Sequence, residues 1–179
     1  MGGVVYVVVA CRALLALVFL VSAAGKLRGR RAFGGFVAEV RAWRLVPAWS
    51  VTVVAGGVAV AEAAVPVLLV VPAAVPFGLL VAGSLVAVFT LGIVITRRRG
   101  LSARCSCFGR AAAPLGRRHV VRNVFLLGAV GAALAPVTDR GTAPAVLVAI
   151  GAGALGALVV TTLDEITDLF APLPDAPRS

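Results

Sequence analysis

The chain has 179 residues, of which 61% are hydrophobic and only 13% are charged, and its mean hydropathy is +1.07. Soluble domains carry about 25% charged residues, so this composition excludes a water-soluble enzyme and equally excludes a disordered chain. The formal net charge is +10, but no recognition motif and no interleaving of aromatic and basic residues accompanies it, so we expect no nucleic-acid partner.

Five apolar stretches approach the roughly 20 residues that a helix needs to cross a bilayer core of about 30 Å. They cover residues 4–24, 51–71, 74–95, 120–137 and 143–163. In lipid the backbone must pair within its own segment, which favours helices. The predicted fold is all-α: a polytopic transmembrane helical bundle with four core helices and a fifth at 143–163. Residues 1–179 then form a single integral membrane domain.

The first stretch resembles a signal peptide in length, but residues 1–11 contain no basic residue and Arg12 lies inside the apolar run. A signal peptide carries its positive charge before the apolar run. We therefore expect a retained helix.

The two longer connections are strongly basic and predict the topology. Residues 25–50 contain six basic residues and one acid, Glu39, and residues 96–119 contain seven arginines and no acid. These connections lie on the same side by parity, and the positive-inside rule places both in the cytoplasm of a bacterial cell. The N-terminus is then outside, and the acidic tail with Asp164, Glu165 and Asp168 is cytoplasmic.

Small residues recur at four-residue spacing in the last two stretches, which favours close helix packing. The pairs are Gly128 with Ala132, Gly131 with Ala135, and Ala152 with Gly156.

Cys105 and Cys107 form a Cys-Ser-Cys motif in the second basic connection, and Cys11 lies alone in the first stretch. A disulfide between residues two apart is strained and therefore labile, and the flanking Arg104 and Arg110 favour the reactive thiolate. This pattern indicates thiol–disulfide exchange at Cys105 and Cys107, and the alternative is a pair of loop cysteines without a role. A zinc ion needs four ligands and His119 is the one obvious further candidate, so no metal site is predicted.

Arg12 and Glu62 are ionisable residues inside predicted spans, where such groups are costly and usually functional. Lys26 and Ser50 mark the cytoplasmic ends of the first two stretches. Arg12 lies about 21 Å from Lys26 and Glu62 about 18 Å from Ser50, and these matching depths predict an ion pair between Arg12 and Glu62. The alternative is that Arg12 extends to the outer interface and Glu62 is protonated.

Polar residues also open the fourth stretch, where His119, Arg122 and Asn123 form an interfacial cluster or a proton relay. Trp43 and Trp49 precede the second stretch, where indoles anchor helices at the membrane interface.

These residues carry a resemblance to known membrane proteins. The run from Arg12 to Leu27, followed by Phe33, Phe36 and Leu45-Val-Pro47, resembles the opening of the DoxX-like and MauE-like proteins. The features that resemble the MauE branch in particular are Glu62, Cys105-Ser-Cys107-Phe-Gly109 and Arg122-Asn123. The resemblance covers about residues 10–137, and the helix at 143–163 and the acidic tail extend beyond it.

The resemblance implies a role in methylamine utilisation, where MauE proteins are thought to help mature the disulfide-rich small subunit of methylamine dehydrogenase beside a thioredoxin-like partner. It implies that Cys105 and Cys107 exchange disulfides with such a partner, in that pathway or a related one. Two alternatives stay open: a non-catalytic assembly subunit, and a protein that binds a small molecule or quinone at Arg12 and Glu62. No other cofactor is expected.

Overall fold

The computed structural model describes residues 3–100, 104–105, 113–114, 117–137 and 141–169, and it describes side chains for all of these except 104–105, 113–114, 117–118 and 163–169. The helices are α1 (Gly3–Leu27), α2 (Arg30–Ala42), α3 (Val51–Val70), the short 3-10 helix η1 (Pro72–Ala74), α4 (Val75–Arg98), α5 (Arg117–Ala133) and α6 (Ala143–Leu169). Two strands of two residues each, β1 (Arg104–Cys105) and β2 (Ala113–Pro114), pair antiparallel between α4 and α5. The predicted all-α class is confirmed.

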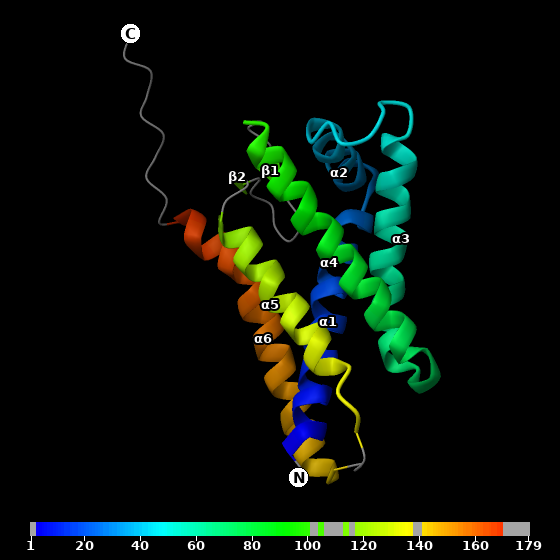
Figure 1. Ribbon diagram of the computed structural model, residues 1–179, viewed down its shortest axis with the longest axis vertical. Helices are drawn as coiled ribbons and strands as arrows, with labels where there is room; N and C mark the ends of the chain where they lie inside the picture. Colours follow the sequence, from blue (N-terminus) through cyan, green and yellow to red (C-terminus); the bar gives the residue numbers. More distant parts are fainter. Residues whose placement is uncertain (1–2, 101–103, 106–112, 115–116, 138–140, 170–179) are drawn as a thin grey trace.

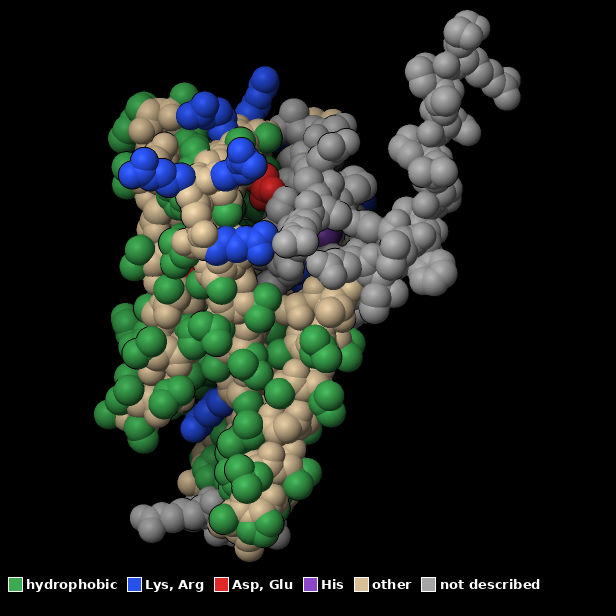
Figure 2. Space-filling view, turned by 180° about the vertical axis from the view of Figure 1, so that it is seen from behind, with side chains coloured by type: hydrophobic (Ala, Val, Ile, Leu, Met, Phe, Trp, Pro, Cys, Tyr) green, Lys and Arg blue, Asp and Glu red, His purple; other side chains and the backbone are tan. Residues whose placement is uncertain are grey.

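Four helical segments are long and apolar enough to cross a membrane. They are Gly3–Leu27, Val51–Val70, Pro72–Arg98 and Ala143–Thr162, and the shorter apolar helix His119–Ala133 lies beside them. Four of the five predicted stretches thus correspond to helices long enough to span a membrane, whereas the predicted stretch 120–137 is helical only to Ala133, in the shorter α5. Large apolar side chains are exposed along the outside of the bundle, as expected where lipid replaces water (Figure 2). The protein is a multi-pass membrane protein.

Helix α1 lies at the centre of the bundle and packs against α3, α5 and α6, while α4 packs against α3 and α5 (Figure 1). The core between these helices is built from aliphatic side chains, among them Leu15, Val18, Leu79 and Leu126, and from Phe19. Long helices that follow one another in the chain run in opposite directions, whereas α1 and α6, which pack together, run in the same direction (Figure 1).

Helices α1 and α6 pack closely against each other, and the contact depends on glycine. A Cβ atom at Gly153 would overlap the carbonyl oxygen of Ala10, and one at Gly156 would lie 2.9 Å from the side chain of Leu14. Gly156 was expected at such a contact, whereas a Cβ at Gly128 or Gly131 would meet no described atom within 4 Å.

Helix α2 occupies the first basic connection, where no helix was predicted. Its residue Phe36 is buried, while Arg30, Arg31 and Arg41 are exposed, so the helix is amphipathic. It lies at the end of the bundle where α3 begins and α4 ends (Figure 1). Most Lys and Arg side chains gather at this end (Figure 2), as expected for one basic side of a membrane protein.

Candidate functional site

Lys26 and Glu62 form a buried ion pair between α1 and α3. The Nζ of Lys26 lies 2.6 Å from Oε2 and 2.8 Å from Oε1 of Glu62, and the two residues are 4% and 2% exposed. Ser22 lies one helical turn before Lys26, accepts a hydrogen bond from Nζ at 2.7 Å and donates one to Oε2 at 3.1 Å. All three ammonium hydrogens of Lys26 thus have acceptors, which a buried cation requires.

The predicted pairing of Arg12 with Glu62 is wrong. The Nη2 of Arg12 donates instead to the carbonyl oxygen of Ala133, the last residue of α5, at 3.2 Å. Because Arg12 precedes Lys26 by 14 residues, the two side chains start about 21 Å apart along α1. A ligand site centred on Arg12 and Glu62 together is therefore excluded as well.

The error has a physical cause in the placement of α3. The prediction assumed that Lys26 and Ser50 lie at the same membrane boundary. In the structure Lys26 contacts Glu62, which lies 11 residues, or about 16 Å, beyond Val51 along α3. Helix α3 therefore begins well past the level of Lys26, and α2 fills the space at that end. Lys26 was available as a candidate, since it is the chain's one lysine and part of the motif that resembles MauE.

Two aromatic rings cover the ammonium group of Lys26. Its Nζ lies 4.7 Å from the ring centroid of Phe36 on α2 and 5.9 Å from that of Phe89 on α4. Cation–π attraction of this kind is stronger away from water. Four helices thus meet at the pair, and sequence reasoning did not assign Ser22 or Phe89 to the site.

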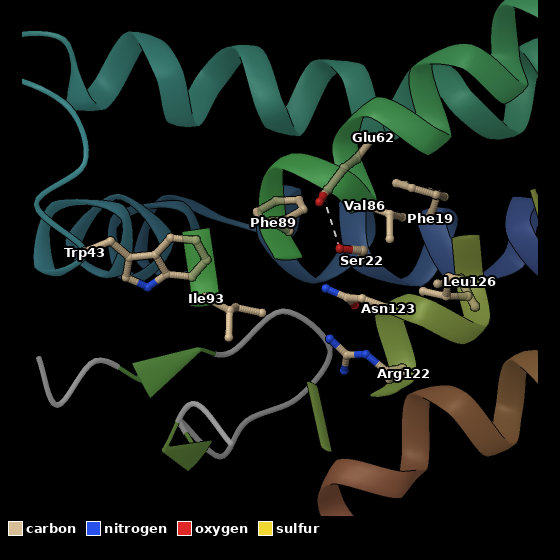
Figure 3. A pocket seen from close by; sticks show the side chains of 11 residues that line it. Phe19, Ser22, Trp43, Glu62, Val86, Phe89, Ile93, Arg122, Asn123 and Leu126 are labelled. Atoms are coloured by element: carbon tan, nitrogen blue, oxygen red, sulfur yellow. Dashed lines mark hydrogen bonds between the residues drawn. The ribbon is translucent and has the colours of Figure 1, made fainter. Parts of the chain in front are cut away.

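A cavity adjoins the pair on the side of Glu62. Its polar lining comes from Ser22, Glu62, Arg122 and Asn123 together with Trp43, and its apolar lining from Val18, Phe19, Val86, Phe89, Ile93 and Leu126 (Figure 3). The space open to the centre of a water molecule is about 30 Å³. Of the predicted polar cluster, Arg122 and Asn123 therefore share one cavity with Glu62. His119 is buried nearby on α5 and is not among the lining residues.

Trp43 belongs to this cavity and not to the membrane interface, which corrects one of the two predicted anchors. Trp43 is 8% exposed, its ring meets Phe89 edge-on at 6.3 Å between centroids, and it packs directly on Gly92. Within the described part of the chain, its Nε1 has no hydrogen-bond partner. Trp49, in contrast, is 83% exposed, as an interfacial indole should be.

The structure describes Cys11 and the backbone of Cys105. Cys105 is in β1, where it pairs across the hairpin with Ala113, and Cys107 lies outside the described residues. Cys11 is half-buried in α1 and packs against the core. Among the described residues no group of three or more His, Cys, Asp or Glu side chains is placed to hold a metal ion.

The family model described as "Methylamine utilisation protein MauE" matches residues 4–136, a range that contains Lys26, Glu62, Cys105, Cys107 and Asn123. The chain belongs to the MauE family. The methylamine utilization protein MauE of Paracoccus denitrificans is 36% identical over 156 residues, which cover 86% of this chain and 79% of that protein. No solved structure matches the chain. The resemblance to MauE is thus confirmed, and the matched MauE region ends before α6, which packs along α1.

Proposed function

We propose that this MauE protein is a membrane accessory factor that exchanges disulfides with a thioredoxin-like partner through Cys105 and Cys107, in methylamine utilisation or a related redox pathway. The observation that carries the proposal is the position of Cys105 in the β1–β2 hairpin. The pairing of Cys105 with Ala113 places the first cysteine of the Cys-Ser-Cys motif in a strand between α4 and α5, outside the helices. This hairpin connects α4 and α5, the two helices that contribute Phe89 and Asn123 to the cavity.

The exchange requires two cysteines that act in turn. The thiolate of one cysteine attacks a disulfide of the partner, which gives a mixed disulfide and releases one partner thiolate. The second cysteine then attacks the mixed disulfide, so that a Cys105–Cys107 disulfide forms and the partner leaves as a dithiol. Two electrons pass to the partner in this direction, and the protons of the two thiols end on the partner's sulfurs. The reverse sequence reduces the Cys105–Cys107 disulfide.

The distribution of charge supports a cytoplasmic partner. The exposed Arg97, Arg98 and Arg99 end α4 just before the hairpin, and α2 places further arginines at the same end. The positive-inside rule puts this end in the cytoplasm, with the N-terminus outside. The motif then exchanges disulfides with a cytoplasmic thioredoxin-like protein.

The cavity does not favour the alternative of a quinone-binding protein. Sites for ligands of drug size measure about 300–1,000 Å³, whereas the space beside Glu62 is about 30 Å³.

Trapping of the mixed disulfide tests the proposal. Cys105→Ser and Cys107→Ser proteins are expressed in cells, quenched with acid and searched for adducts that a reducing agent releases. Removal of one cysteine leaves the mixed disulfide unresolved, so we expect at least one single variant to trap a covalent complex and the double variant to trap none. Cys11→Ser is the matched control and should behave as the natural chain. Absence of adducts from both single variants, together with intact methylamine utilisation in the double variant, would favour the non-catalytic assembly subunit.

A further inference from the structure

The Lys26–Glu62 pair is an expensive way to hold α1 and α3 together. Removing two charges from water costs several kcal/mol per ion, and apolar residues of similar size often give equal or greater stability. Ionisable groups at membrane depth therefore point to a function beyond packing. The cavity beside the pair indicates what that function is.

The two members of the pair face different surroundings. Lys26 donates to Oε1 and Oε2 of Glu62 and to Ser22, and its ammonium group lies against the rings of Phe36 and Phe89. It is not among the residues that line the cavity, whereas Glu62 and Ser22 are (Figure 3). A molecule in the cavity therefore meets the carboxylate. The two carboxylate oxygens offer about four lone-pair sites, of which the hydrogen bonds from Lys26 and Ser22 use three.

The cavity has the size and the polar groups that water needs. One buried water requires about 10–15 Å³ of space that is open to its centre, so the cavity of about 30 Å³ holds about two water molecules. Each water also needs two to four polar partners. The Glu62 carboxylate, the Ser22 hydroxyl and the Asn123 amide face the same space, and the indole Nε1 of Trp43 is a buried donor without a partner among the described residues (Figure 3).

We propose that this cavity is a buried proton-exchange site, in which bound water delivers protons to Glu62 and removes them. A hydronium ion gives its proton to the carboxylate and becomes water, and the carboxylate becomes a carboxylic acid; no electrons move. When Glu62 is protonated, the Ser22 hydroxyl still accepts a hydrogen bond from Lys26, and the rings of Phe36 and Phe89 still cover its ammonium group. The site thus stores one proton beside a fixed positive charge, about halfway along α3.

The other titratable or charged groups near the site lie on α2, α4 and α5, and they include the buried His119 of α5. Glu39 on α2 and Arg122 on α5 act on the pair electrostatically, while Arg97, Arg98 and Arg99 of α4 are exposed. In the described part of the chain, Glu62 is the one charged residue of α3. Replacement of Glu62 therefore removes the one charged group of α3, so a signal that is lost with it can be assigned to Glu62.

Infrared difference spectroscopy of the full chain in lipid nanodiscs tests the proposal. Spectra are recorded as the pH falls, for the natural chain and for Glu62→Gln, in H2O and in D2O. We expect a band of a protonated, buried carboxyl group that grows as the pH falls, shifts in D2O and is lost in Glu62→Gln. Glu39→Gln is the matched control and should keep the band.

Two results would overturn the proposal. One is the absence of any Glu62-dependent carboxyl band over the pH range in which the protein stays folded. The other is a band that does not shift in D2O, because a carboxyl group out of reach of water cannot exchange its proton. If Glu62→Gln fails to fold, the Glu62→Asp variant, which keeps the carboxylate, is used in its place. A proton-exchange site then shows a carboxyl band at a displaced frequency, whereas a static ion pair shows no such band. Because the readout is the carboxyl group itself, failure of the dithiol proposal leaves this result unaffected.

Discussion

Lys26 and Glu62 are separated by 36 residues in the sequence, and the Nζ of Lys26 lies 2.6 Å from Oε2 of Glu62. The contact joins the last turn of α1 to the middle of α3. Phe36 of α2 and Phe89 of α4 cover the ammonium group from two other helices. The pair therefore sets how far α3 is shifted along α1, and any change to it acts on four helices together.

Removal of one partner of this pair should destabilise the bundle strongly. Lys26→Met leaves the Glu62 carboxylate buried without its cation, which typically costs about 3–5 kcal/mol. The Lys26→Met, Glu62→Met double variant should recover most of that loss, because no uncompensated charge remains. Unfolding in detergent, followed by circular dichroism, measures each value. A double variant less stable than both single variants would contradict the pairing.

Arg12 should be energetically independent of Glu62. The two side chains bind different partners, so the effects of Arg12→Met and Glu62→Met should add within about 0.3–0.5 kcal/mol in a double-mutant cycle. Arg12→Met alone should cost about 1.5–3 kcal/mol through loss of the charged hydrogen bond to the Ala133 carbonyl. Amide hydrogen exchange should rise at the end of α5. Arg41→Met, which removes an exposed charge on α2, is the control and should change little.

Gly153→Ala should weaken the packing of α6 on α1. The added methyl group overlaps the Ala10 carbonyl, and overpacking of this kind costs about 1–3 kcal/mol. Gly151→Ala in the same helix meets no described atom within 4 Å, so it should stabilise the protein by about 0.5–1 kcal/mol as glycine is lost from a helix. Thermal unfolding of the two variants side by side gives the comparison, and equal effects would refute the close contact.

Labelling of single cysteines should show the basic end in the cytoplasm. In a background without Cys11, Cys105 and Cys107, Thr142→Cys in the connection between α5 and α6 should react with a membrane-impermeant reagent in intact cells. Arg31→Cys on α2 should react only after the membrane is permeabilised. The reverse pattern would invert the topology.

Most of the helical framework could be predicted from the sequence, because backbone groups in lipid must pair within their own segment. The apolar stretch at 51–71, for example, corresponds to α3 (Val51–Val70) almost residue for residue. Helix α2 was missed because it has no apolar stretch. It buries Phe36 and exposes its arginines, and its stability comes from packing on the rest of the protein.

The sequence by itself determined that the chain spans a membrane, that its two basic connections lie on one side, and that Glu62 is an unusual charge in an apolar helix. It could not determine the partner of Glu62, because that partner depends on how far α3 is shifted along the axis of α1. A shift by one residue moves a side chain by about 1.5 Å along the axis, and neither helix alone encodes the shift. The tertiary structure decided it: α2 packs beyond the end of α1, α3 starts past Lys26, and Glu62 comes level with Lys26 instead of Arg12. At this level Glu62 also lines the cavity that Asn123 and Trp43 line.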